Sequence, residues 1–553
     1  MPADNDLQPP FFAAVTTLAT WTILFLFGHL RDLIRKRVYS KRAQGYAPIR
    51  QDYEDFYTRR MYYRIHDCWN RPIASAPDAW IDVLERTPVC GQEALNLTGK
   101  TRRCLNLGSY NYLGFAAADE YCTPRVRKVL SEYGCGMCSS RIAAGTTQLH
   151  VDLERMIADF VGQEDAITFG MGFATNSIII PALVGKECLV LSDSLNHASI
   201  VTGVRGSGAK VKVFGHNDVI HLEQVLQDSI AYGQPRTRKP WKKVLIIIEG
   251  IYSMEGEMCP LREVVAIKKK YKAYLFLDEA HSIGAMGKRG GGVCEHFGVS
   301  PADVDVMMGT FTKSFGSCGG YIAGPRALIQ CMRRIGPGHC YASSMSPPAV
   351  EQVMSAVRVL RGQDGSDRGV KKIQQLRDNA NYFRQRLTDM GCFVLGSQDS
   401  PVMPIMLFNP GKMTSTSRIL FEQNIAMTIV GFPATALLSA RARVCISASH
   451  TREDLDWALQ VTFSSSLEHD AEDVSVWAAG LHDTGFSHIY IMQVLDELSE
   501  RCLIRYNKSS TEQHNKDKVL RATAVMCEVP LKSQNLLQIL ARSEACVQPT
   551  VPN

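Results

Sequence analysis

The sequence lacks a strong charge bias, a regular cysteine pattern and internal repeats. Its 553 residues carry a net charge of only +6. No stripe of lysines and arginines with interleaved aromatic residues occurs, so a nucleic-acid-binding protein is disfavoured. The 17 cysteines are odd in number and scattered, which argues against the disulfide framework of a small secreted protein and favours reduced thiols facing the cytosol. Cys135-Gly136-Met137-Cys138 has no second pair at zinc spacing, so we expect no metal site.

The remaining composition is that of an ordinary globular protein, with 45% hydrophobic and 21% charged residues. The chain is too long for one core, so we expect several domains. Changes in pattern along the sequence divide it into five parts. These are a membrane anchor with a basic flank at 1–50, an N-terminal arm at 51–110, a large domain at 111–345, a small domain at 346–465 and a tail of unknown role at 466–553.

One long uncharged run stands out, at residues 11–30. As a helix it would be about 30 Å long, the thickness of the hydrocarbon layer of a membrane. A cluster of lysines and arginines begins at Arg31, whereas Asp4 and Asp6 precede the run, and this asymmetry places the rest of the chain in the cytosol. A cleaved signal peptide would need a basic segment before a shorter apolar core. We expect an uncleaved anchor, and whether it spans the membrane or lies in it stays open.

Short apolar runs alternate with amphipathic stretches from about residue 105 onward. Doubly buried strands with helices between them predict an α/β fold with a mostly parallel central sheet, and the small domain is expected to be α+β. The expected strands are Ala166–Phe169, Cys188–Leu191, Val211–Phe214, Val244–Ile248, Tyr274–Leu277, Val306–Met308 and Tyr321–Ala323. The expected helices are Leu149–Phe160, Leu222–Tyr232, 349–361, 368–390 and Val476–Leu503. Residues 31–100 give only a mixed pattern.

A lysine and an aspartate follow two of these strands. Lys313 lies among hydroxyls and glycines in Gly309–Gly316, and Asp278 ends the apolar run that begins at Tyr274. A lysine amine can form a Schiff base with pyridoxal 5′-phosphate, and an aspartate can keep its ring nitrogen protonated. A surface lysine and a helix-capping aspartate are the alternatives. Ligands of such sheets bind at the carboxyl ends of the strands, where both residues lie, so we predict a pyridoxal-phosphate enzyme.

Further residues could complete such a site. The turn Gly170–Asn176 leads from a strand into a helix, whose free N–H groups would hold the cofactor phosphate. His281 could donate to the ring 3-oxygen, and His197 could stack on the ring, although a lone histidine is more often structural. Two glycine-rich stretches, 287–292 and 316–320, are expected to be mobile loops near the pocket mouth, and they would fit a phosphate equally well. A substrate carboxylate needs a guanidinium, but Arg441 and Arg443 share one face of a strand, so spacing does not separate them.

Four motifs resemble the α-oxoamine synthases, a family of fold-type I pyridoxal-phosphate enzymes. They are Phe311–Gly316, Asp278–Ser282, Gly172–Asn176 and Asn196–Ser199. Within that family the chain is similar to the lysine-bearing long-chain-base subunits (subunit 2 type) of eukaryotic serine palmitoyltransferases. This narrower resemblance covers about residues 20–465. It rests on the motifs Gly108–Phe115, Gly233–Arg238, Glu249–Gly256 and Val430–Thr435, and on Arg31–Leu33 and Tyr53–Arg59.

The resemblance implies a role for each matching residue. Lys313 would be the Schiff-base lysine, Asp278 the partner of the ring nitrogen, and Arg443 rather than Arg441 the carboxylate-binding residue. Ser343 and Ser344 would reach across a dimer interface to the partner's cofactor site. The other implied cofactor contacts are His197, which is also expected to be catalytic, His281, Ala280, Gly172, Phe173, Thr310 and Thr312. The chain departs from the family at Ala436, Cys318, Cys135 and Cys138, and Cys318 puts the packing of the lysine loop in doubt.

The implied reaction is the decarboxylating condensation of L-serine with palmitoyl-CoA or another long acyl-CoA, giving 3-ketosphinganine, the first step of long-chain-base synthesis. The implied partners are a lysine-less long-chain-base subunit of the subunit 1 type, in a heterodimer, and small regulatory membrane subunits. The implied location is the endoplasmic reticulum membrane, with the catalytic body in the cytosol. Two alternatives stay open: an α-oxoamine synthase with another amino acid or acyl-CoA, and a non-catalytic membrane scaffold.

Overall fold

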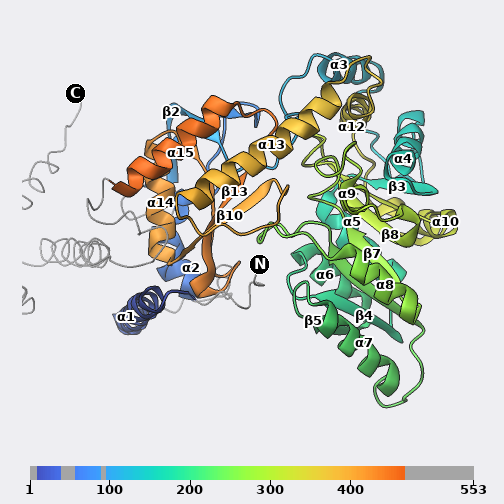
Figure 1. Ribbon diagram of the computed structural model, residues 1–553, viewed down its shortest axis with the longest axis horizontal. Coiled ribbons are helices and arrows are strands. Elements are labelled where there is room, and N and C mark those ends of the chain that lie inside the picture. The colour runs from blue at the N-terminus through green and yellow to red at the C-terminus, as the bar shows by residue number, and fades with distance from the viewer. Residues whose placement is uncertain (1–8, 39–55, 89–94, 468–553) are drawn as a thin grey trace, which may run out of the picture. The chain divides into compact units, whose positions relative to one another are not determined.

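The computed structural model describes residues 9–38, 56–88 and 95–467 (Figure 1). They belong to one structural unit, Met1–His482. A second unit, Asp483–Asn553, lies outside the described residues, as does the helix expected at Val476–Leu503. The parts of the chain that carry the candidate site residues are therefore all described.

A seven-stranded sheet in the order β3-β9-β8-β7-β6-β4-β5 forms the centre of the large domain. Every strand expected from the apolar runs is present in it. Strands β4 to β8 run parallel to one another, and β9 is antiparallel to both of its neighbours, β3 and β8. The strands are β3 Asp165–Phe169, β4 Cys188–Asp193, β5 Lys210–Phe214, β6 Lys243–Glu249, β7 Tyr274–Asp278, β8 Val306–Thr310 and β9 Gly320–Gly324. The prediction of a mostly parallel α/β sheet is confirmed.

Helices cover both faces of this sheet because its side chains alternate between two buried clusters. Leu245, Ile247 and Phe276 pack with α5, α6 and α10, whereas Ile246 and Leu275 pack with α4, α7, α8 and α12. This alternation is the two-residue period of a strand. The helices are α4 Gln148–Val161, α5 Gly172–Leu183, α6 Ala198–Ser207, α7 Val219–Tyr232, α8 Leu261–Tyr271, α10 Arg326–Ile335 and α12 Pro347–Leu360.

The small domain contains two three-stranded sheets. One has the order β10-β13-β12, with β10 Val402–Phe408, β12 Thr428–Val430 and β13 Ala440–Cys445. The other joins the N-terminal arm to this domain, because β2 Leu95–Asn106 pairs both with β1 Trp80–Pro88 and with β11 Ile425–Ala426. The arm is thus part of the small domain's framework. Helices α13 Arg368–Asp389, α14 Pro410–Glu422 and α15 Arg452–Leu467 complete the domain.

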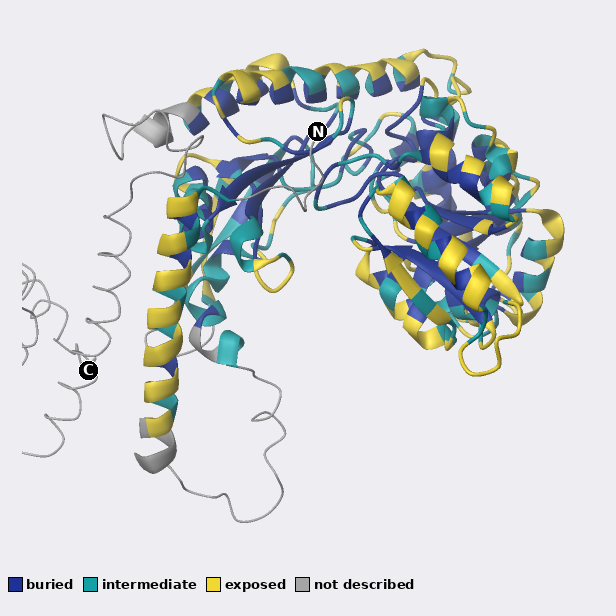
Figure 2. Ribbon diagram, turned by 60° about the horizontal axis from the view of Figure 1, so that its bottom comes forward, coloured by how far each residue is buried: buried dark blue, intermediate teal, exposed yellow. Residues whose placement is uncertain are grey.

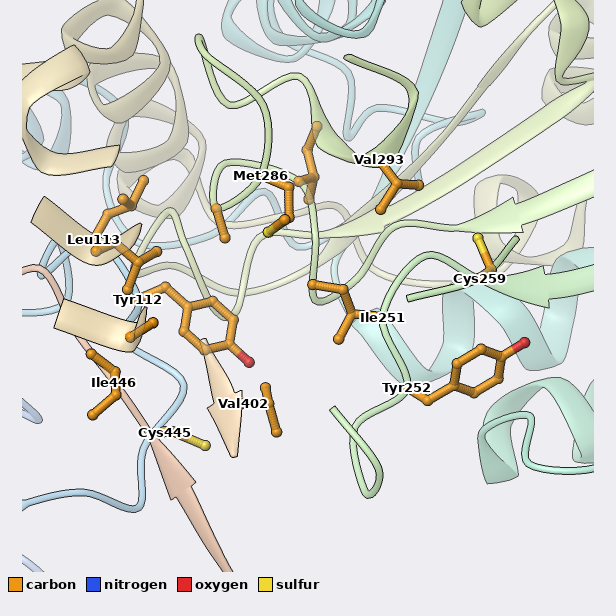
Figure 3. Close-up of a cluster of buried hydrophobic side chains, with 14 of the residues drawn as sticks. Tyr112, Leu113, Ile251, Tyr252, Cys259, Met286, Val293, Val402, Cys445 and Ile446 are labelled. Carbon is orange, nitrogen blue, oxygen red and sulfur yellow. The ribbon is translucent and has the colours of Figure 1, made fainter. Parts of the chain in front are cut away.

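A continuous buried cluster joins the two domains. Figure 3 shows Tyr112 and Leu113 next to Cys445 at the end of β13, with Ile251 and Met286 of the large domain on the other side. All five side chains are buried and belong to the same apolar cluster. The cluster fixes the end of β13 against the large domain, so residues of that strand can face the carboxyl ends of the large sheet.

Helix α1, Phe11–Val38, has a largely exposed surface (Figure 2). Its residues Phe11–Leu33 form the one helix in the described ranges that is long and apolar enough to cross a membrane. One side contacts the small domain: Ala13 packs with Phe408 and neighbouring residues, and the rings of Trp21 and Phe432 meet edge to face at 5.7 Å. The expected apolar helix is present, with the composition of a membrane-associated segment.

The remaining elements are short. They are α2 Phe56–Arg60, η2 Tyr62–Arg64, η3 His66–Cys68, α3 Cys122–Tyr133, α9 Gly292–Phe297, η4 Pro301–Asp303, α11 Pro337–Cys340 and η5 Leu437–Ser439.

Candidate active site

The candidate site lies at the carboxyl ends of the parallel strands. Glu249 ends β6, Asp278 ends β7 and Thr310 ends β8, and the register pairs Glu249 with Asp278 on adjacent strands. Lys313 follows β8 by three residues. Because β6, β7 and β8 run in the same direction, these groups meet at one edge of the sheet, as the sequence predicted.

Asp278 is held rigidly at this edge. Its side chain is 3% exposed. One carboxylate oxygen accepts from Asn176 Nδ2 at 2.7 Å, and the other accepts from the backbone N–H of Ala280 at 2.9 Å. Asn176 also donates to Ser199 Oγ at 3.0 Å, which ties helices α5 and α6 to the carboxylate. Two fixed donors leave the carboxylate oriented for a further partner in the site.

Lys313 lies near these acids, and its side chain is half-buried. Burial lowers the pKa of Lys313 to about 8, and the nearby Asp278 and Glu249 charges oppose that shift only in part. Its Nζ lies 5.7 Å from the centre of the Tyr110 ring. With a pKa near 8, roughly one fifth of the amines are neutral at pH 7.4, compared with about one in a thousand for an ordinary lysine. The amine is therefore primed to act as a nucleophile or base.

His197 is fixed at the start of α6. Its Nδ1 accepts from the backbone N–H of Ser199 at 3.2 Å, and its own backbone N–H donates to the carboxylate of Glu249. Burial lowers the pKa of His197. The charge of Asp278 raises this pKa in part, and the charge of Lys313 lowers it further. A neutral imidazole that accepts at Nδ1 carries its proton on Nε2. The same burial raises the pKa of Glu249 well above its usual range, with Asp278 as a second cause.

His281 is held by an aromatic residue that precedes the large sheet. Its Nδ1 lies 2.7 Å from the hydroxyl of Tyr112, and its ring meets that of Tyr110 edge to face at 5.0 Å. Burial and then the charges of Lys313 and Arg443 hold the pKa of His281 well below its usual range. The imidazole is thus neutral and can act as a hydrogen-bond partner to an uncharged or anionic group.

The turn at the start of α5 offers hydrogen-bond donors to an anion. A Cβ at Gly172 would lie 3.0 Å from Thr310 Cγ2, so a side chain at this position would crowd the turn. The first intrahelical bond here is Thr175 N–H to Met171 O, so the N–H groups of the helix start have no partner within the helix. Thr312 Oγ1 lies 3.3 Å from Thr310 Oγ1, which adds hydroxyl donors to the same turn. Phe173, in the same turn, has its ring 6.2 Å from that of His197.

The two candidate arginines differ in their partners. Arg441 is ion-paired with Glu255, with Nη1 and Oε1 3.4 Å apart, and also donates to Met254 O. Arg443 is 6% exposed and donates from Nη1 to the sulfur of Met254 at 3.5 Å, while its Nε has no partner. Its guanidinium lies 4.7 Å above the ring of Tyr110. Among the described residues no carboxylate neutralises Arg443, which leaves it suited to the carboxylate of a ligand.

These groups fit pyridoxal phosphate. Lys313 supplies an amine of lowered pKa, and Asp278 supplies a fixed carboxylate for the ring nitrogen. The neutral imidazole of His197 suits the ring face, and His281 offers a hydrogen-bond partner for the ring oxygen. The free N–H groups at α5 and the hydroxyls of Thr310 and Thr312 can hold a phosphate, and Gly172 is the residue that keeps the required space. The donor set thus matches each chemical group of that cofactor.

Comparison with known proteins decides the family. The family model for aminotransferase class I and II matches residues 102–461. The chain is 62% identical to long chain base biosynthesis protein 2d of Oryza sativa subsp. japonica over 455 residues, covering 82% of this chain and 93% of the relative. This chain belongs to the aminotransferase class I and II family. It is also 48% identical to serine palmitoyltransferase 3 of Homo sapiens over 462 residues, covering 82% of this chain and 84% of the relative.

Solved structures agree with this membership. A structure of SPT with its PLP internal aldimine matches with a TM-score of 0.64 and 28% identity, covering 73% of this chain and 94% of that one. The chain is therefore a fold-type I pyridoxal-phosphate-dependent acyltransferase. The predictions of family, fold and cofactor from the sequence are confirmed.

Ser343 and Ser344 lie beside the turn before α5. Ser343 pairs with Ser140 in an isolated bridge, and its carbonyl would lie 3.6 Å from a Cβ at Gly170. Ser344 Oγ donates to Ser139 O at 3.1 Å. Their expected contribution to a partner's site stays a prediction.

The glycine-rich stretch 287–292 is more firmly packed than a mobile loop would be. Gly292 has a φ of +81°, and a Cβ there would lie 2.7 Å from Glu279 Cδ, so only glycine fits. Glu279 accepts from the N–H of Val293 at 3.0 Å and from the hydroxyl of Ser282. Burial raises the pKa of Glu279 to about 7. This second acid supports the loop behind Asp278.

Sequence reasoning assigned no role to Tyr110, Tyr112 and Asn176. Tyr110 lies between Arg443 and His281, Tyr112 holds His281, and Asn176 holds Asp278. All three belong to motifs that carried the family resemblance, which is the only signal in the sequence that could have singled them out. Their partners lie 100 or more positions away, so no local pattern could reveal the contacts.

Proposed function

We propose that this chain is the lysine-bearing subunit of a serine palmitoyltransferase, which condenses L-serine with palmitoyl-CoA or another long acyl-CoA. The products are 3-ketosphinganine, carbon dioxide and free CoA. The single observation that carries the proposal is the meeting of Lys313, Asp278 and Arg443 at one edge of the large sheet, in a chain 62% identical to a long chain base biosynthesis protein. The cofactor, when bound, supplies a sink for the electron pair released at the serine Cα.

Arg443 binds and orients the serine carboxylate. Its guanidinium is buried, lies against Tyr110 and has a free Nε, and a planar guanidinium can hold a carboxylate through two parallel hydrogen bonds. Fixing the carboxylate restricts rotation about the Cα bonds, so that the bond to be broken can be held in the reactive orientation. Arg441 serves the fold instead, through its ion pair with Glu255.

Lys313 acts as the base that removes the proton from the serine Cα. Its lowered pKa, which follows from burial, allows a neutral amine near physiological pH. The Cα then forms a bond to the acyl carbonyl carbon, the thioester C–S bond breaks and CoA leaves. Loss of carbon dioxide breaks the bond between Cα and the carboxylate, and a proton returned to Cα completes the product.

His197 would lie against the face of the bound cofactor ring, and its Nε2–H could donate to the acyl oxygen as negative charge develops there. Its neutral state and the bonds that fix Nδ1 support this role. When the cofactor is bound, Asp278 would keep its ring nitrogen protonated, and His281, held by Tyr112, would hold its ring oxygen. The phosphate would be bound by Gly172, Phe173, Thr310 and Thr312. Ala280, two residues after Asp278, would also contact the cofactor.

The proposal extends to the assembly and location of the enzyme. The chain pairs with a lysine-less long-chain-base subunit, with Ser343 and Ser344 reaching toward that subunit's cofactor site, and it binds small regulatory membrane subunits. Helix α1 keeps the enzyme at the endoplasmic reticulum membrane with its body in the cytosol. A membrane location is chemically useful because the acyl chain and the product both partition into lipid. The five-part division of the chain belongs to the same proposal, with the arm at 51–110 built into the small domain's sheet.

The test is the visible spectrum and the activity of the purified chain, expressed alone and with the lysine-less subunit. We expect a cofactor band that shifts on addition of L-serine and is absent in Lys313→Ala, together with ketosphinganine formation in the co-expressed protein. Arg441→Lys, which keeps the charge of a residue outside the site, is the matched control and should retain the band. A cofactor-replete wild-type chain with no band would contradict the proposal and favour a scaffold.

A further inference from the structure

The turn between α7 and β6 carries a dense set of cations that the proposed reaction does not use. The turn, residues 233–243, follows α7 near the bottom of Figure 1. Arg236, Arg238, Lys239 and Lys242 are all exposed, and the turn contains no acidic residue. In the described part of the chain no carboxylate forms an ion pair with any of the four. The exposed charge is therefore available to an external anion.

The turn is rigid, although it is exposed. Gln234 N–H donates to Lys239 O at 2.8 Å, and Arg238 N–H donates back to Gln234 O at 2.9 Å. The indole N–H of Trp241 donates to Ser229 O at 2.7 Å, which fastens the turn to α7. A Cβ at Gly233 would lie 2.7 Å from Arg238 O, so the start of the turn requires glycine. These contacts fix the backbone that carries the four cations.

Two arginines occupy backbone conformations that favour glycine or asparagine. Arg236 has a φ of +69° and Arg238 a φ of +57°, in the left-handed region that residues with a large side chain seldom adopt. Such strain indicates a functional constraint when the surrounding contacts hold it in place. The side chain of Arg238 also lies over the ring of Tyr232, with 5.7 Å between the guanidinium carbon and the ring centre.

The cationic surface continues onto the amino ends of neighbouring strands. Lys210 begins β5 and Lys243 begins β6, on either side of β4, and Lys186 precedes β4. The N–H of Lys242 donates to the carbonyl of Glu187, and Glu187 and Asp228 are exposed acids near the turn. Of these strands, β6 ends in Glu249 at the edge of the sheet that carries the candidate site. Because β6 has seven residues, the two edges are about 20 Å apart, so this surface lies at the opposite edge of the sheet from Lys313.

Exposed apolar side chains border the cations. Tyr232 is 65% exposed and Ile230 is 45% exposed, both at the end of α7. Aromatic residues beside lysines and arginines are typical of segments that lie at the boundary between membrane headgroups and water. A soluble phosphate would need the cations alone, whereas a lipid surface also accepts the apolar side chains. The combination favours a membrane.

We propose that residues 230–243, with Lys186 and Lys210, bind the anionic headgroups of the membrane that holds the enzyme. This rests on the membrane location proposed above. Each lysine or arginine near an anionic leaflet contributes about 1 kcal/mol, or about a 5-fold factor in affinity. The large domain would thus have its own contact with the bilayer, separate from helix α1, and its orientation would depend on the content of anionic lipid.

The test is amide hydrogen exchange of the full-length holoenzyme in nanodiscs, of phosphatidylcholine alone or with 30% phosphatidylserine. We expect exchange of peptides covering 233–243 to slow at least 5-fold with phosphatidylserine, and the protection to disappear in 0.5 M NaCl because salt screens exposed charges. The variant R236Q/R238Q/K239Q/K242Q should lose the protection. The variant R127Q/K128Q/K371Q/R386Q, which removes four exposed cations elsewhere, should keep it.

The possible results distinguish failure of the headgroup-binding inference from failure of the proposed membrane location. Equal exchange in both kinds of nanodisc, or protection that persists in the first variant, would overturn the inference. Protection that needs the lysine-less subunit but not phosphatidylserine would overturn it in favour of an acidic protein partner. Exchange of α1 peptides in the same samples reports whether the chain is membrane-bound at all, so failure of the anchor is visible independently.

Discussion

Arg443 and Arg441 provide a paired prediction, because they lie two residues apart on β13 and differ in their partners. Arg443→Gln removes a guanidinium that is 6% exposed and has no carboxylate partner among the described residues. Two hydrogen bonds to a charged group are worth about 3 to 6 kcal/mol together, so we expect kcat/KM for L-serine to fall by about two to four orders of magnitude. Arg443→Lys should recover only part of this, because an ammonium cannot bind a carboxylate bidentately.

The stability changes should run in opposite directions. Arg443→Gln removes an uncompensated buried charge, so the ligand-free protein should gain stability. Arg441→Gln breaks the pair with Glu255 and leaves that carboxylate without this guanidinium, which should cost about 3 to 5 kcal/mol of unfolding free energy. Steady-state kinetics with serine as the varied substrate and thermal unfolding of the two variants check both parts. An unchanged serine response in a folded Arg443→Gln protein would refute the assignment, as would a selective loss of serine binding in Arg441→Gln.

Three further predictions follow from the titrating groups. In cofactor-free protein, the rate of cofactor uptake should rise with pH through about 8, because burial lowers the pKa of Lys313 to that value and the neutral amine reacts; stopped-flow absorbance checks this. In the folded protein the pKa of Glu279 is raised to about 7, above its unfolded value. The free energy of unfolding should therefore fall by about 3 kcal/mol as the pH rises from about 4.5 to 7. Denaturant titrations of Glu279→Gln should lack that loss. Tyr112→Phe should lower kcat by about 10-fold through loss of the bond to His281 while leaving the serine KM near its wild-type value, as initial-rate kinetics would record.

The strands of the large domain could be predicted because each is a short apolar run, and all but the edge strand β5 are largely buried. The same pattern is enough to place Asp278 and Lys313 at one edge of the sheet, since each follows the end of a parallel strand. The hairpin of β1 and β2 could not be predicted in this way, since most of β2 is exposed and its alternation lacks a clear apolar face. The distinction between Arg441 and Arg443 was also beyond the sequence. It depends on Glu255, which lies 186 positions away, and no periodicity links the two.

The bond between Tyr112 and His281 marks the same limit. The two residues are 169 positions apart, and each alone is an ordinary buried side chain. Only the folded chain, with the segment after β2 packed against the turn after β7, brings the hydroxyl to the imidazole. Contacts of this kind set the orientation of catalytic groups, and family resemblance can indicate the residues involved without explaining what they do.

The buried cluster at the junction of the domains limits how a substrate can enter. Tyr112, Cys445 and Met286 are each at most 2% exposed and contribute to one continuous interior. Swinging the small domain away on a hinge would bring these side chains into water, at about 1.5 to 3 kcal/mol for each large apolar group. Wide domain opening is therefore costly in each catalytic cycle. Serine and the acyl thioester must reach Lys313 by local movement of loops around a closed interior.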